Sequence, residues 1–223
     1  MPEPRLALIA ALAVALGWLV VGLAGLVRPQ STFVVSRLMF PLGALGGVLL
    51  AIAGLASLAA PPVELVLPLG LPDLPMHLRL DSLSAFFLFL LGSAVAGISV
   101  FAAGYFRSGE GTSPGLLCLQ YHVFLASMTL VLLANDAYAF MVSWESMALA
   151  SYFLVTTQHR IPEIRAAGFL YLLLAHVGAI AILLCFGVLQ GGSWQFTFEA
   201  MREAELPRGL PGKCRFRSRR SDR

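Results

Sequence analysis

Six apolar runs dominate this sequence, and each is about as long as a helix that crosses a membrane. A transmembrane helix needs roughly 20 apolar residues to cross a hydrocarbon core of about 30 Å. Transmembrane β-strands alternate over segments of about 10 residues, whereas these runs are continuously apolar. The sequence therefore predicts an all-α polytopic membrane protein with about six transmembrane helices. They are expected at residues 6–27, 40–60, 83–103, 116–133, 137–156 and 166–189.

The composition argues against a soluble enzyme. Hydrophobic residues make up 58% of the chain and charged residues 12%, against about 25% charged residues in a typical soluble domain. The sequence contains no nucleotide-binding glycine loop, zinc-protease motif, CxxC pair or nucleophile elbow. Its three cysteines lack the spacing of a metal site. We therefore expect no catalytic residues, no metal, no cofactor and no nucleic-acid partner for this chain.

The connections between the runs carry two local signals. Residues 61–80 are rich in proline and glycine, and Val63–Leu67 and Met76–Leu80 alternate loosely around the centre, which predicts a small β-hairpin. Repeated prolines leave an extended loop as the alternative. The fourth and fifth runs are separated only by residues 134–136, which predicts a tight antiparallel turn in which Asp136 has a turn role.

Arginines in the short connections predict the orientation in the membrane. Basic residues concentrate in cytoplasmic loops. The first, third and fifth connections hold five arginines, and the opposite side holds two before the sixth run. These arginines are Arg28, Arg37, Arg107, Arg160 and Arg165 against Arg5 and Arg79. We therefore expect the N-terminus outside, in a multi-pass protein of the bacterial inner membrane.

The C-terminal part changes character. Apolar residues at Phe196, Phe198, Met201 and Leu206 alternate with polar ones, which predicts a short interfacial helix. Residues 207–223 are strongly basic and have no apolar periodicity. We expect residues 1–206 to form the helical region and residues 207–223 to form a disordered tail that is foreign to the fold.

Glu145 is the residue that most strongly indicates a function. It lies near the middle of the fifth run, which carries no other formal charge. A charge at this depth costs roughly 2.5–3.5 kcal/mol on insertion scales, so it marks a functional site by default. His176 lies near the middle of the sixth run, and consecutive antiparallel helices place both groups at similar depth. Imidazole titrates near neutral pH, so the pair is predicted to transfer protons.

Both residues also have a structural interpretation. Glu145 could form a hydrogen bond between helices, and His176 could pack against a backbone carbonyl. Further polar groups could complete a proton pathway or simply bond neighbouring helices. For His122 the structural role is favoured, because it lies nearer the end of its run. The candidates for this pathway are Ser143, Ser146, Tyr152 and His122.

Three segments resemble the antiporter-like membrane subunits. They are LRLDSLSAFF (78–87), FLASMTLVLLANDAYAFMVSWESMALASYFLV (124–155) and AGFLYLLLAHVGAIAILL (167–184). This family includes the large proton-pumping subunits of respiratory complex I, subunits of multisubunit sodium/proton antiporters and membrane subunits of energy-converting hydrogenases. Within it, the residues most resemble the large membrane subunits of hydrogenase-4 and of formate hydrogenlyase.

The resemblance implies a larger fold of inverted helical repeats, of which this chain would be the N-terminal part. Glu145 matches the family's essential glutamate, and the implied function is proton translocation beside other membrane and hydrophilic subunits. The family pairs this glutamate with a lysine in a later helix, whereas the only lysine here is Lys213. The chain is therefore expected to be truncated. A sodium/proton antiporter subunit and an inert membrane scaffold fragment are the alternatives.

Overall fold

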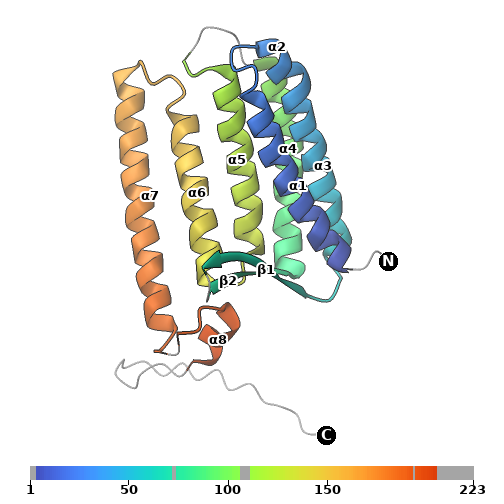
Figure 1. Ribbon diagram of the computed structural model, residues 1–223, viewed down its shortest axis with the longest axis vertical. Coiled ribbons are helices and arrows are strands. Elements are labelled where there is room, and N and C mark those ends of the chain that lie inside the picture. Colours follow the sequence, from blue (N-terminus) through green and yellow to red (C-terminus); the bar gives the residue numbers. More distant parts are fainter. Residues whose placement is uncertain (1–3, 72–73, 106–110, 193, 205–223) are drawn as a thin grey trace, which may run out of the picture.

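Six long helices lie side by side in the computed structural model of the chain (Figure 1). The structure describes residues 4–71, 74–105, 111–192 and 194–204. The long helices are α1 Pro4–Gly25, α3 Phe40–Ser57, α4 Ser82–Tyr105, α5 Pro114–Leu133, α6 Ala137–Val155 and α7 Pro162–Leu189. Each overlaps one of the six predicted runs, with ends that differ by a few residues, so the predicted all-α polytopic fold is present.

The second membrane helix begins earlier than its apolar run. A short helix, α2 Thr32–Val34, and a π-helical turn, Val35–Met39, continue into α3 without a break. Ser31 starts this helix because its hydroxyl oxygen accepts the Val34 amide at 3.4 Å. Capping by serine is a local signal that hydropathy does not register.

Five helical segments of the described chain are long and apolar enough to cross a membrane. The segment α6 is not among them, because Ser143, Glu145 and Ser146 lower its hydropathy. It nevertheless runs between α5 and α7 along most of their length (Figure 1). The least apolar helix is therefore the one that carries the candidate acid.

Helices α7, α6 and α5 form a row that continues into a group made by α5, α1, α3 and α4. Helix α7 packs on α6, α6 on α5, α5 on α1, α1 on α3, and α3 on α4. The core lies among α1, α3, α4 and α5, where Trp18, Phe40, Leu50 and Leu88 are fully buried. Helix α7 stands at the edge of the row and buries only Gly168 and Ala179 among its described side chains (Figure 1).

Glycines bring α3 and α4 into close contact. A Cβ at Gly47 would lie 2.8 Å from the Gly92 carbonyl oxygen, and a Cβ at Gly54 would lie 2.6 Å from the Ala85 carbonyl oxygen. Small residues permit this approach in membrane helices, where van der Waals packing drives association.

The predicted β-hairpin is confirmed. Strands β1 Val63–Leu71 and β2 Leu74–Leu80 pair antiparallel, with Val63 opposite Leu80 and an irregularity between Leu67 and Gly70. The hairpin crosses beneath the ends of the helices, on the same side as the N-terminus (Figure 1).

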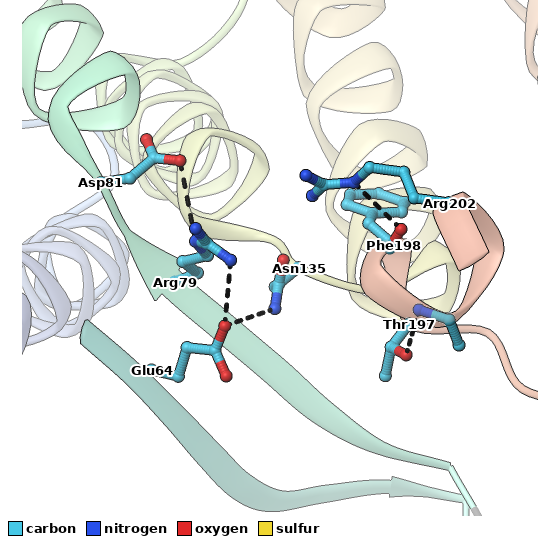
Figure 2. A network of polar contacts seen from close by, with 8 residues as sticks. Glu64, Arg79, Asp81, Asn135, Thr197, Phe198 and Arg202 are labelled. Atoms are coloured by element: carbon cyan, nitrogen blue, oxygen red, sulfur yellow. Dashed lines mark hydrogen bonds and ion pairs between the residues drawn. The ribbon is translucent and has the colours of Figure 1, made fainter. Parts of the chain in front are cut away.

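Polar contacts join the α5–α6 turn to this hairpin and to the segment after α7. Glu64 of β1 accepts hydrogen bonds from Arg79 at 3.2 Å and from Asn135 at 3.4 Å (Figure 2). The Asn135 carbonyl oxygen accepts the Phe198 amide at 3.1 Å. Thr197 caps the short helix α8 Phe198–Glu203 (Figure 2). The tight turn and the short helix are therefore both confirmed, although Leu206 lies outside the described residues.

The tail at residues 207–223 also lies outside the described residues. Its disorder and its foreign origin therefore stay predictions.

Candidate proton-transfer site

Two contacts align α6 with α7 and thereby position the candidate pair. Towards the hairpin end, the rings of Phe140 and Phe186 meet edge to face with centroids 5.9 Å apart. Towards the other end, Gly168 lies directly against the Thr156 methyl group, and a Cβ there would lie 3.3 Å from the Tyr152 ring. Glu145 and His176 lie between these two contacts.

The structure brings Glu145 and His176 together. The distance from His176 Nε2 to Glu145 Oε2 is 3.6 Å. This is longer than a hydrogen bond, yet a small rotation or one bridging water molecule would close it. The two groups can therefore form either an ion pair or a neutral hydrogen-bonded pair, according to which holds the proton.

A backbone carbonyl sets the tautomer of His176. Its Nδ1 lies 2.9 Å from the carbonyl oxygen of Leu172, one helical turn earlier. Because a carbonyl only accepts, Nδ1 carries a hydrogen and donates it. This leaves Nε2, the nitrogen that faces Glu145, as the one that gains or loses a proton.

Neither side chain is enclosed by the described chain. The Glu145 side chain is 40% exposed and that of His176 is 50% exposed. Large apolar residues such as Phe169, Leu174 and Leu184 share this exposure along α7. An ionisable pair at mid-helix depth is costly against lipid, so this face is suited to contact with further protein.

The remaining pathway candidates are divided between two places. Ser146 and Tyr152 line a cavity of about 830 Å³ between α5 and α6, which we call the α5–α6 cavity. The Ser146 hydroxyl donates to the Val142 carbonyl oxygen at 2.8 Å. Ser143 is buried and does not line this cavity. Ser146 thus places one end of the cavity next to Glu145 in the chain.

His122 belongs to the core on another side of α5. It is fully buried, and its Nδ1 donates to the Cys118 carbonyl oxygen at 2.8 Å. Its ring faces Phe40, and a Cβ at Gly43 of α3 would lie 2.9 Å from its Nε2. These surroundings favour packing over participation in the Glu145–His176 pair.

Sequence analysis raised a backbone carbonyl as a partner of His176, and the structure identifies it as the carbonyl of Leu172. One feature of the site was missed. Sequence analysis used Arg165 only to predict the orientation in the membrane, yet Arg165 and His159 both line the α5–α6 cavity. Within the described residues, no group of three or more His, Cys, Asp or Glu side chains is arranged to hold a metal ion.

Known proteins with similar sequences support the resemblance to membrane subunits. No family model matches the chain. It is 34% identical over 151 residues to hydrogenase-4 component B of Escherichia coli, covering 68% of this chain and 21% of that protein. It is 26% identical over 153 residues to NADH-quinone oxidoreductase subunit L of Mycobacterium tuberculosis, covering 67% of this chain and 22% of that protein.

Both proteins are homologues of this chain. The resemblance to the antiporter-like membrane subunits is confirmed. The chain spans about a fifth of the length of these curated relatives.

A solved structure supports the fold. The chain superposes on a chain of the membrane-bound sulfane sulfur reductase, an archaeal respiratory membrane complex, with a TM-score of 0.68. The match covers 83% of this chain and 28% of the other, at 22% identity. At this identity the match shows the fold alone, and it confirms a polytopic membrane architecture.

Proposed function

We propose that this chain is a proton-translocating membrane subunit of an energy-converting respiratory assembly of the hydrogenase or complex I type. The observation that carries the proposal is the Glu145–His176 pair, two titratable groups 3.6 Å apart at the middle of adjacent helices. The homologues among respiratory membrane subunits support the same class of function. Redox chemistry would lie in partner subunits.

The proposed step moves one proton between two named atoms. A protonated Glu145 gives its proton from Oε2 to Nε2 of His176, directly or through one water molecule. The carboxyl group becomes a carboxylate and the imidazole becomes an imidazolium. Nδ1 keeps its hydrogen, which stays hydrogen-bonded to the Leu172 carbonyl oxygen. The product is an ion pair, and the reverse transfer restores two neutral groups.

The partly exposed pair supports an assembly with other membrane components. Further protein over the α6–α7 face would exclude lipid from both groups and would offer the next proton acceptor. We propose that this partner is a membrane subunit, or a further helical segment, in the bacterial inner membrane.

The test is proton uptake by vesicles that contain the assembled complex. Glu145→Gln keeps the shape and hydrogen-bonding capacity of the side chain but removes titration, so we expect proton transfer to be abolished while assembly is unchanged. Glu163→Gln, in the exposed first turn of α7, is the matched control and should retain transfer. Normal proton uptake with Glu145→Gln would contradict the role of Glu145 as a proton carrier and would favour the scaffold alternative.

A further inference from the structure

The α5–α6 cavity has the dimensions of a site for one lipid chain. Its lining runs along α5 from Ser113 to Val123 and along α6 from Thr156 to Ser146. Ten residues of helix rise about 15 Å. This is half of a hydrocarbon core of about 30 Å, so the cavity is as deep as one leaflet.

The walls of the cavity are mostly apolar. Side chains of both helices and the ring of Phe153 face the space between them. Leu116, Leu149 and Phe153 are each about two-fifths to one-half exposed, at 40%, 48% and 42%. An acyl chain laid along these walls would remove this apolar surface from contact with mobile lipid or water.

The mouth of the cavity is basic. Arg165 lies there, and its Nη1 donates to the carbonyl oxygens of His159 at 2.8 Å and Arg160 at 3.3 Å. These bonds hold the guanidinium group in place through one of its three nitrogens. His159 itself also lines the mouth.

Two hydroxyl groups stand beside this cation. Thr112 donates to the Thr157 carbonyl oxygen at 3.1 Å, which ties the start of α5 to the end of α6. Ser113 is the N-cap residue of α5, but its side chain makes no capping bond to the first turn. The Ser113 hydroxyl is thus oriented by neither helix and can serve a ligand.

We propose that the α5–α6 cavity binds one anionic phospholipid from the leaflet at this end of the helices. Arg165 and the Ser113 hydroxyl hold the phosphate, and one acyl chain lies between α5 and α6. Among the described residues that line the cavity, none is acidic. A choline or ethanolamine headgroup therefore finds no carboxylate for its cation, whereas a headgroup with net negative charge meets only positive or neutral groups.

The experiment compares two lipids with the same acyl chains. The full chain is purified in detergent and titrated with phosphatidylglycerol or phosphatidylcholine, and bound lipid is counted by native mass spectrometry. We expect one phosphatidylglycerol to be retained in preference to phosphatidylcholine. Equal retention of the two lipids, or retention of neither, would overturn the proposal.

Two variants and one control locate the site. Arg165→Gln should weaken phosphatidylglycerol binding about five-fold, since one basic side chain near an anionic lipid contributes on that order. Arg160→Gln removes the same charge from the loop just before α7, but Arg160 does not line the cavity, so binding should be unchanged. An equal effect of both variants would show non-specific attraction and contradict the assignment.

Filling the cavity tests the position of the acyl chain. Leu149→Trp places a large ring in the cavity, whereas Leu173→Trp places the same ring on α7 outside the cavity, at a residue of nearly equal exposure. Only the first should abolish the retained lipid, with the circular dichroism of both variants unchanged. Retention of lipid by a folded Leu149→Trp variant would place the lipid elsewhere.

Discussion

Asp136 connects two segments of the chain through one buried carboxylate. Its Oδ1 accepts the Ala139 amide at 2.6 Å and caps α6, while its Oδ2 accepts the His77 amide of β2. The neighbouring Ala137 amide bonds the Phe196 carbonyl oxygen at 2.9 Å. The start of α6, the helix that carries Glu145, is thereby fixed to the hairpin and to the segment after α7.

Asp136→Ala should lower the free energy of unfolding by about 2 kcal/mol, because it removes a helix cap and leaves the His77 amide unpaired. Asp81→Ala is the matched control. Asp81 caps α4 through the Ser84 amide at 2.9 Å, but it is 38% exposed, so its loss should cost about 0.5–1 kcal/mol. Thermal unfolding in detergent measures both, and equal losses would contradict the connecting role of Asp136.

At the residue scale, the sequence predicted which groups meet but not how they meet. Glu145 and His176 were predicted at similar depth from their positions in consecutive apolar runs. Whether the two side chains face each other depends on the rotation of each helix about its axis. The Phe140–Phe186 and Gly168–Thr156 contacts set that rotation, and the residue pattern of neither helix predicts them.

At the scale of elements, the pair α3–α4 depends on glycines at matching heights. A Cβ at Gly92 would overlap the Ala51 backbone nitrogen and lie 2.5 Å from the Gly47 carbonyl oxygen. On the same helix, a Cβ at Gly97 would meet nothing within 4 Å. Replacing each glycine with alanine therefore distinguishes the effect of close helix packing from the effect of helix propensity.

Gly92→Ala should destabilise the protein by about 1–3 kcal/mol, since backbone atoms rather than flexible side chains stand in the way. Gly97→Ala should leave stability unchanged or raise it by up to about 1 kcal/mol, because alanine is the better helix former. Unfolding of both variants in the same detergent provides the comparison. A neutral Gly92→Ala variant would show that α3 and α4 approach less closely than the structure has them.

The elements themselves were largely predictable, and the departures have physical causes. Apolar length located all six helices, and alternation located the hairpin. The helix that contains α3 starts at Thr32 rather than near residue 40, because Ser31 caps it in a stretch of mixed polarity. The small-residue pair Gly43 and Gly47 is visible in the sequence, but only the structure shows what each glycine meets. Gly47 lies against the backbone of α4, while Gly43 lies against the side chains of His122 and Ser99.

At the scale of the whole molecule, successive helices run in alternating directions. The start of α1, the hairpin and α8 lie at one end of the helices, and the last turns of α1, α4 and α6 lie at the other (Figure 1). This alternation agrees with the spans predicted from the sequence. The side that faces the cytoplasm stays a prediction from the five-to-two arginine bias.

Cysteine labelling decides the orientation. In a background without the native cysteines, Leu69→Cys in the hairpin should react with an impermeant maleimide only from outside. Arg160→Cys should react only from inside, as the positive-inside rule requires. Labelling of residue 160 in intact cells would reverse the orientation and place the basic mouth of the α5–α6 cavity in the outer leaflet.

The hydrogen bond from His176 Nδ1 to the Leu172 carbonyl makes the imidazole a one-sided carrier. In the proposed mechanism, a proton that arrives at Nε2 leaves through Nε2, because the carbonyl oxygen does not take the other proton. Delivery to a different acceptor then requires that this bond break and the ring turn. The arrival of the proton at His176 and its delivery to the next acceptor are thereby separated in time, and the rate of ring rotation sets an upper limit on turnover.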